Sequence, residues 1–223
     1  RDGELLKVEK PTYSFVYEPR GLLYSSFSGC FENFKKDVQE LITNKSFFID
    51  FKTMVIKELV DLPTVNTELS NSIWEEIKLY EKNKYNYSAV CYGRPGTGKS
   101  TLARTIAKHF GNYIVIEELS SLLDTNSIVD TLKILNSKII VIEDFDRNLF
   151  DKKTLSLLEE FKQLGIHIIA TINKLENIDS AILRPGRFDK IVEINKLEES
   201  VVLEMVDNDI EIFNIVKDYP IAY

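Results

Sequence analysis

The sequence predicts an α/β fold in which helices cover both faces of a parallel sheet. Short apolar runs typical of buried strands alternate along the chain with amphipathic helical segments, and one apolar run leads directly into a glycine-rich turn. Five parallel strands are expected, at residues 89–92, 113–116, 138–142, 166–172 and 190–194. Helices are expected at residues 68–82, 99–110, 127–135 and 153–164. The expected architecture therefore has three layers, αβα, with its ligand crevice at the carboxyl ends of the strands.

Segments outside this alternating pattern predict two smaller units. Residues 1–60 lie outside the alternating pattern and are for that reason expected to form a small α+β appendage. They contain an aromatic-rich strand pattern at 12–17, a second strand pattern at 22–27 and a helical pattern from Phe31 to Ile42. Residues 61–196 are expected to be the large domain. Residues 197–223 have two short helical patterns, 197–206 and 210–216, and predict a truncated helical lid.

The glycine-rich turn has the spacing of a phosphate-binding P-loop, G-x-x-x-x-G-K-[ST], between a strand and a helix. Its glycines allow backbone N–H groups to point at phosphate oxygens, and the following helix adds the positive end of its dipole. Lys99 supplies a cation, and Ser100 offers a hydroxyl to Mg²⁺. The sequence therefore predicts nucleoside triphosphate binding. The expected binding residues are Gly93, Arg94, Pro95, Gly96, Thr97, Gly98, Lys99, Ser100 and Thr101.

A second motif follows the strand at 139–142, where the chain continues with Glu143, Asp144, Phe145 and Asp146. A buried strand that ends in acids beside a P-loop is what a Walker B element requires, because the acids must reach the bound Mg²⁺ and the attacking water. Without the P-loop, the same pattern would equally fit an apolar strand that ends in a solvated acidic turn.

A third run, ATINKLENIDSAILRPGRFD, resembles the AAA subfamily of AAA+ ATPases, and the resemblance extends over roughly residues 60–195. It implies that ATP and Mg²⁺ are the cofactors and that copies of the chain assemble into a ring, most often of six subunits. Asn173 falls at the family's sensor 1 position, which helps to place the attacking water. Arg184 and Arg187 fall at the arginine-finger positions, which reach the nucleotide of the next subunit. By position, Glu143 is the magnesium-side acid and Asp144 polarises water, or the two exchange roles.

The order of these two acids is a departure, because the family normally has Asp followed by Glu. The inverted order, the short span that precedes it and the RPGRFD run are similar to the branch of mitochondrial inner-membrane translocases that move a folded Rieske protein. From Glu117 to Lys138 the chain has no aromatic residue, whereas unfoldases of the family place one there to grip an extended polypeptide. The sequence therefore does not favour a mechanism in which an extended polypeptide is threaded through the ring.

The overall composition bounds the possible partners and location. The net charge of −7 does not favour nucleic acid, and no apolar stretch has the length of a membrane span. Cys30 and Cys91 suggest neither a disulfide framework nor a metal cluster, so an intracellular, by default cytoplasmic, location is expected. His109 and His167 are expected to be structural.

Three functions follow from these observations. The first is an ATPase that acts in a homo-oligomeric ring and remodels or translocates a protein partner of unknown identity. The second is a nucleic-acid-directed loader of the same superfamily. The third is a nucleotide-responsive ring scaffold with weak hydrolysis, which the inverted Glu143–Asp144 order keeps open.

Overall fold

The computed structural model describes most of the chain. The described residues are 6–10, 13–18, 21–27, 36, 40, 43–50, 55–59, 64–65, 67–117, 119, 125–147, 152–178, 180, 182–184, 187–196 and 199–217. The helix predicted from Phe31 to Ile42 lies mostly outside these residues.

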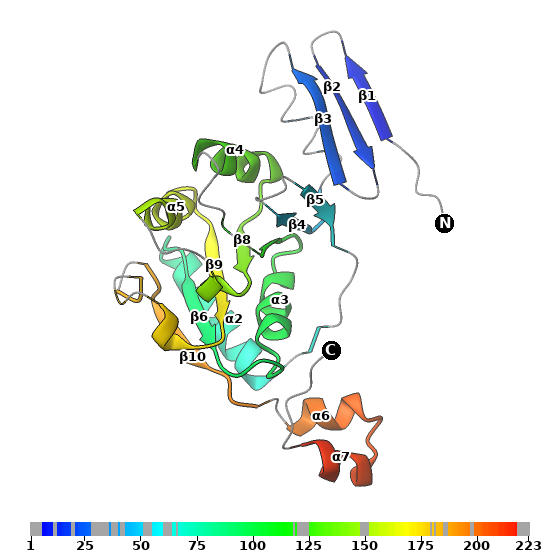
Figure 1. The fold of residues 1–223 in the computed structure, drawn as a ribbon, viewed down its shortest axis with the longest axis vertical. Coiled ribbons are helices and arrows are strands. Elements are labelled where there is room, and N and C mark those ends of the chain that lie inside the picture. The colour runs from blue at the N-terminus through cyan, green and yellow to red at the C-terminus, as the bar shows by residue number, and fades with distance from the viewer. Residues whose placement is uncertain are drawn as a thin grey trace.

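A seven-stranded sheet forms the centre of the molecule (Figure 1). Its strands, in spatial order, are β10 (Lys190–Glu193), β6 (Ser88–Tyr92), β9 (His167–Ile172), β8 (Ile139–Ile142), β7 (Ile114–Ile116), β4 (Phe47–Asp50) and β5 (Val55–Glu58). Every neighbouring pair is parallel except β4 and β5, which are antiparallel. All five predicted strands are present.

The strand count is where the prediction was wrong, because β4 and β5 extend the sheet from five strands to seven. Both strands come from residues that the sequence analysis assigned to the appendage. Phe47 and Ile49 of β4 are almost fully buried in the core on one face of the sheet. The segment from Phe47 to Met54 is ambiguous by its apolar pattern alone, and it is recognised as a strand only through its partner β7, which lies more than 60 residues further along the chain.

Helices cover both faces of the sheet and complete the predicted three layers. On one face, α2 (Glu68–Lys82) and α3 (Lys99–Lys108) pack over side chains that include Cys91, Val115 and Val141. On the other, α4 (Thr125–Leu135) and α5 (Lys152–Gln163) pack over alternate residues of the same strands. The period of two along each strand divides the apolar residues between two cores.

Helix α2 follows its sequence pattern closely. Thr67 and Ser70 form a reciprocal capping box, with each hydroxyl accepting a backbone N–H at 2.9 Å. Ile73 and Ile77 are fully buried, whereas Leu79 lies on the outer face.

The partly buried Trp74 stacks on His109 with ring centroids 4.7 Å apart. The other histidine, His167, is buried, and its Nδ1 accepts a hydrogen bond from the Tyr87 backbone N–H at 2.9 Å.

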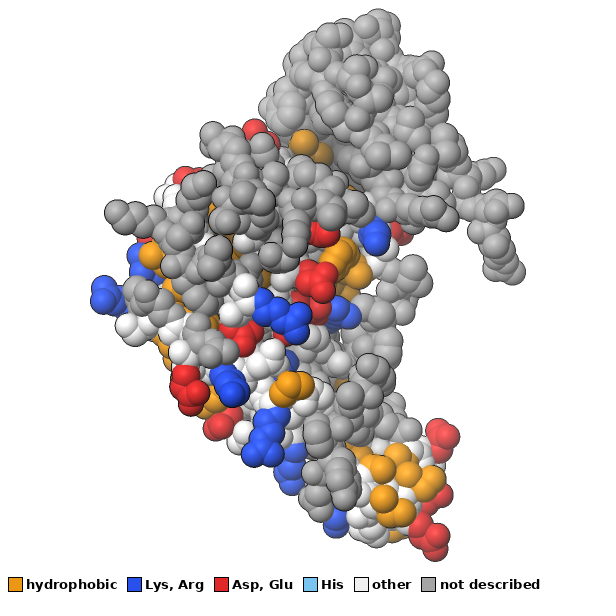
Figure 2. Space-filling view, in the orientation of Figure 1, with side chains coloured by type: hydrophobic (Ala, Val, Ile, Leu, Met, Phe, Trp, Pro, Cys, Tyr) orange, Lys and Arg blue, Asp and Glu red, His pale blue; other side chains and the backbone are white. Residues whose placement is uncertain are grey.

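Two peripheral units flank the main sheet. An antiparallel sheet of β1 (Leu6–Lys10), β2 (Tyr13–Glu18) and β3 (Gly21–Phe27) precedes it, with β3 next to β5. Two short helices, α6 (Glu199–Met205) and α7 (Ile210–Val216), follow β10 near the predicted positions. Apolar side chains of this helical pair, among them exposed isoleucines of α7, gather on its outer surface (Figure 2). Among the helices that the structure describes, none is long and apolar enough to cross a bilayer.

The packing of α2 gives a stability prediction with an internal control. Ile77→Ala removes a fully buried side chain, and we expect the free energy of unfolding to fall by about 2–5 kcal/mol. Leu79→Ala, two residues along the same helix but 58% exposed, should change it by about 0.5 kcal/mol or less. Urea unfolding of the two variants measures both values. Equal losses would contradict the assignment of this face to the core.

Candidate nucleotide-binding site

The P-loop connects β6 to α3 at the carboxyl edge of the sheet. Strand β6 ends at Tyr92 and α3 begins at Lys99, so the loop is residues 93–98. Gly98 is the N-cap of α3 in the left-handed conformation, with φ of 85°, and provides no side-chain cap. The first N–H groups of α3 therefore have no capping side chain and point into the loop, which is the arrangement that binds an anion.

Gly93 is the position of closest backbone approach. A Cβ atom built there would lie 2.0 Å from the backbone oxygen of Ile194, which directly follows β10. The approach is fixed by the sheet, because the Ile194 N–H donates to the Tyr92 oxygen at 2.7 Å. Within the loop, the Thr97 hydroxyl donates to the Arg94 oxygen at 2.9 Å. Position 93 therefore has to be glycine for two reasons. A side chain there would collide with the Ile194 backbone, and the loop backbone must be free to approach a phosphate.

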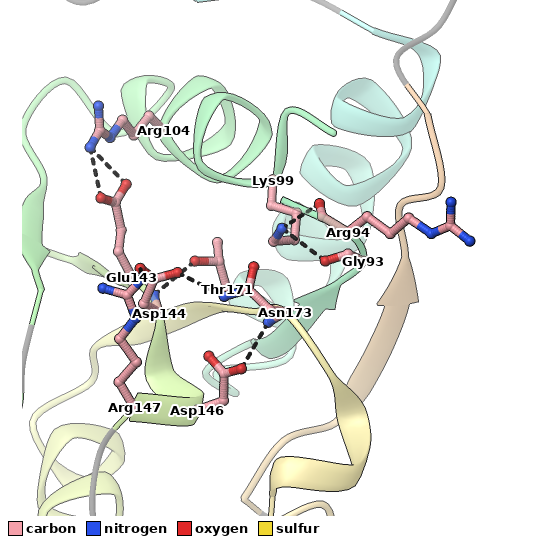
Figure 3. Close-up of polar contacts among 10 residues, drawn as sticks. All are labelled: Gly93, Arg94, Lys99, Arg104, Glu143, Asp144, Asp146, Arg147, Thr171 and Asn173. Carbon is pink, nitrogen blue, oxygen red and sulfur yellow. Dashed lines mark hydrogen bonds and ion pairs between the residues drawn. The ribbon is translucent and has the colours of Figure 1, made fainter. Parts of the chain in front are cut away.

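Lys99 is folded onto the loop that it follows. Its Nζ donates to the backbone oxygens of Gly93 at 2.9 Å and Arg94 at 2.8 Å, and only 7% of the residue is exposed (Figure 3). Burial lowers the pKa of the ammonium group, while Asp144 and Asp146 oppose that shift. The side chain of Arg94, in contrast, points away from the site (Figure 3). The P-loop cation is thus held by carbonyl groups that phosphate oxygens could replace.

Glu143 lies beside Ser100 and is paired with an arginine. Its carboxylate accepts from Nη2 of Arg104 on α3, with the two oxygens 2.7 and 2.8 Å from that nitrogen. The Ser100 hydroxyl lies near enough to favour the charged form of this carboxylate. Burial raises the pKa of Glu143, and the Arg104 guanidinium and the Ser100 hydroxyl oppose this shift. A hydroxyl and a carboxylate side by side are oxygen ligands of the kind Mg²⁺ prefers, so these residues fit a magnesium ion.

Asp144 and Asn173 meet across the ends of neighbouring strands. Asn173 Nδ2 donates to Oδ1 of Asp144 at 3.3 Å, and Nη2 of Arg147 lies 3.0 Å from Oδ2 (Figure 3). The Asp144 backbone, at a positive φ of 45°, donates its N–H to the Thr171 hydroxyl at 3.2 Å. Asp146 accepts the backbone N–H of Asn173 at 3.1 Å. Each side chain is therefore held in place by groups from the other strand end.

Several of these supporting residues were not predicted from the sequence. Asp146 is part of the acidic run after β8 and could have been singled out there. Thr171 lies two residues before Asn173 and therefore on the same side of its strand. Arg104 lies four residues after Ser100, so it shares a face of α3 with it. Nothing in the sequence pattern around Arg147 indicated that it would contact Asp144.

Arg184 and Arg187 lie at the other end of the sheet from the P-loop of their own chain. The Arg187 carbonyl and the Asp189 carboxylate both accept from the Ser88 hydroxyl, at 2.8 and 2.7 Å, and Ser88 is the first residue of β6. The P-loop begins after the last residue of that strand. Five strand residues separate the two ends by about 16 Å. Arg184 is exposed, and the Arg187 guanidinium lies 3.4 Å from Glu159 of α5.

An apolar pocket borders the other side of the P-loop and joins it to the lid. Thr97 and Gly98 form one wall, and Val201 of α6 forms part of another. None of the lining residues outside the P-loop was predicted from the sequence to be part of the site. The pocket is lined by Val65, Thr67, Leu69, Thr97, Gly98, Thr101, Leu102, Ile194, Lys196 and Val201.

Fold and site together define a P-loop nucleotide-binding domain, with the loop, two acids and an asparagine at one edge of a parallel sheet. Residues 89–196 match the family described as "ATPase family associated with various cellular activities (AAA)". The chain therefore contains an AAA domain. This implies ATP as the bound nucleotide, with Mg²⁺ as its usual partner ion.

Curated relatives agree with this assignment. The chain is 31% identical over 190 residues to a "Proteasome-activating nucleotidase" of Methanococcus vannielii, covering 73% of this chain and 43% of that protein. It is 25% identical over 211 residues to "Peroxisomal ATPase PEX6" of Saccharomyces cerevisiae, covering 78% of this chain and 20% of that protein. The chain thus spans less than half the length of these relatives.

The close approach at Gly93 predicts a selective loss in the variant Gly93→Ala. Its Cβ would collide with backbone, so the loop must move away from β10, and we expect both nucleotide affinity and thermal stability to fall. Gly165→Ala is the matched control: φ is +79° there, but nothing lies within 4 Å. It should cost about 1–2 kcal/mol of stability and leave nucleotide affinity unchanged. Isothermal titration with ADP and thermal melts compare the two, and equal affinities would refute the steric argument.

Proposed function

We propose that this protein hydrolyses ATP in a homo-oligomeric ring, of six copies by family resemblance, and uses the energy to remodel or translocate a protein partner. One observation carries the proposal. The groups suited to binding triphosphate and orienting water gather at one edge of the sheet, while the backbone of Arg184 and Arg187 is anchored through the Arg187 carbonyl at the other end of β6, about 16 Å along the strand.

Binding of the triphosphate is assigned to the P-loop. Its backbone N–H groups and the α3 N-terminus face the phosphate oxygens, and Lys99 exchanges its carbonyl partners for them. Ser100 and Glu143 would hold Mg²⁺, which when bound neutralises charge on the phosphate groups. The apolar pocket that includes Leu69 and Val201 would receive the base, because it lies next to the loop and is lined mainly by aliphatic groups.

The water-orienting acid is assigned to Asp144 rather than Glu143. Both oxygens of Glu143 contact Arg104, and the Ser100 hydroxyl favours the charged form of the same carboxylate, so we place this acid at the metal ion rather than at the water. Asp144 is about one-third exposed and shares a hydrogen bond with Asn173. An acid and an amide held this way can accept a proton from water and fix its position.

The arginines are assigned to the nucleotide of a neighbouring subunit. The Arg187 backbone is held at the opposite end of β6 from the P-loop, about 16 Å along the strand, and its guanidinium is turned to Glu159 of α5 rather than to the phosphate site of its own chain. In a ring, the exposed Arg184 and the half-buried Arg187 could face the next copy, where they would stabilise charge that develops on the transferred phosphoryl group. Such an arginine contributes roughly 10³–10⁵ in rate in related enzymes.

A protein partner is favoured over nucleic acid. The net charge is −7, and the face drawn in Figure 2 has acidic and basic side chains intermixed rather than a basic patch. The relatives' names refer to a proteasome and a peroxisome. Within the family, we propose kinship with the Rieske-protein translocase branch on the basis of the Glu143–Asp144 order, the short span that precedes it and the RPGRFD run.

Mixing of two inactive variants tests whether the arginines act between subunits. Lys99→Met subunits retain both arginines but lack the P-loop cation, and Arg184→Ala/Arg187→Ala subunits have the opposite defect. Each alone should be inactive. In an equal mixture, about one quarter of the interfaces of a closed ring combine an intact P-loop with an intact arginine pair, so ATP turnover should partly recover. A mixture as inactive as its components would reject the arrangement.

Asp144→Asn distinguishes a hydrolase from a nucleotide-responsive scaffold. The amide cannot accept the proton from water, so we expect turnover to fall by about 10²–10⁴ while ATP binding is retained. Single-turnover hydrolysis and equilibrium binding measure the two effects separately. Native turnover no higher than that of the variant would favour the scaffold.

A further inference from the structure

Arg104 of helix α3 forms an ion pair with Glu143, one of the two residues of the proposed magnesium site. One nitrogen of Arg104 lies 2.7 and 2.8 Å from the two oxygens of Glu143, and both side chains are largely buried, at 22% and 15% exposed. Within the described residues, the buried Nε of Arg104 has no hydrogen-bond partner. The guanidinium therefore makes its polar contact to this carboxylate through a single nitrogen.

The pairing depends on the longer acid. A carboxylate at position 143 that is one methylene shorter would withdraw by about 1.5 Å and leave Arg104 beyond ion-pair distance. The inverted Glu-then-Asp order therefore has a structural consequence: it puts the acid that can reach α3 on the metal side. The shorter Asp144 remains with Asn173, at 3.3 Å.

We propose that Arg104 is a positioning residue that holds the Glu143 carboxylate on α3 in the nucleotide-free protein, so that Arg104 and Mg²⁺ compete for the same carboxylate. This inference rests on the proposed function, since it takes Ser100 and Glu143 as the metal side of the site. It follows from charge: a cation placed on an acid weakens the attraction of that acid for a second cation. The same cation also reduces the repulsion between the acid and incoming phosphate groups.

Two opposite effects on nucleotide binding follow. Without Mg²⁺, Arg104 should favour the nucleotide, because it neutralises Glu143. With Mg²⁺, it should oppose binding, because the ion must displace or share the guanidinium. The quantity that contains both effects is the ratio of the nucleotide Kd in EDTA to the Kd in saturating Mg²⁺. Arg104 lowers this ratio, and by thermodynamic linkage the half-saturating Mg²⁺ concentration moves in the opposite direction.

The experiment measures that ratio with a fluorescent ADP analogue. Arg104→Met should raise it by about tenfold, within the usual 5–150-fold range of site–site coupling, and should lower the half-saturating Mg²⁺ concentration. Lys108→Met is the matched control, because it removes a cation one turn further along the same helix at an exposed position. It should leave the ratio unchanged.

A second variant covers the possibility that Arg104→Met fails to fold. Arg104→Gln removes the charge but keeps a polar side chain on α3 and leaves Glu143 unchanged, and it should raise the ratio in the same direction. An unchanged or lowered ratio in the folded variants, or equal weakening with and without Mg²⁺, would overturn the inference while leaving the proposed function intact. Native protein that fails to bind the analogue in saturating Mg²⁺ would overturn both.

Discussion

Parallel pairing of β6, β9 and β8 is the constraint on which the site depends. In this register Tyr92 is paired with Ile172, so the next residue of each strand, Gly93 and Asn173, emerges at the same level. Strand β8 ends two residues lower, because Ile142 is paired with Ala170, so the acids that follow it rise to the level of the same strand ends. The P-loop, the acids and the asparagine are therefore brought together by backbone hydrogen bonds. A slip of one residue would turn their side chains to the other face of the sheet.

The charges of the site are paired before any ligand arrives. Lys99 is bound by two carbonyl groups, Glu143 by Arg104, and Asp144 by Asn173 and an arginine. A buried charge without a partner is costly, and these contacts remove that cost in the nucleotide-free protein. Binding of phosphate therefore exchanges one set of partners for another. Affinity is set by the difference between the two sets, which makes the residues that hold the acids and the lysine as influential as those that face the ligand.

The sequence predicts the local parts of this arrangement well and the long-range parts poorly. The P-loop and the five strands are contiguous patterns, so spacing and apolar runs are sufficient to locate them. Strand β4 is only four residues long and is defined by its pairing with β7, which no local pattern reveals. The contact between Arg104 and Glu143 joins residues 39 positions apart and depends on how α3 lies over the sheet. The apolar pocket joins segments as distant as Val65 and Val201, so only the folded chain defines it.

Strand β10 connects the segment of Arg187 to the region of the P-loop and the apolar pocket. It begins shortly after Arg187, which Ser88 anchors at one edge of the sheet, and it ends at Glu193 at the other edge. The next residue, Ile194, lies against Gly93 and lines the apolar pocket. Parallel hydrogen bonds to β6 hold this four-residue strand along its length. A force on Arg187 from a neighbouring subunit would therefore be carried by one paired strand to the P-loop and to the base of the lid. In the proposed ring, this strand would therefore link adjacent nucleotide sites through the sheet itself.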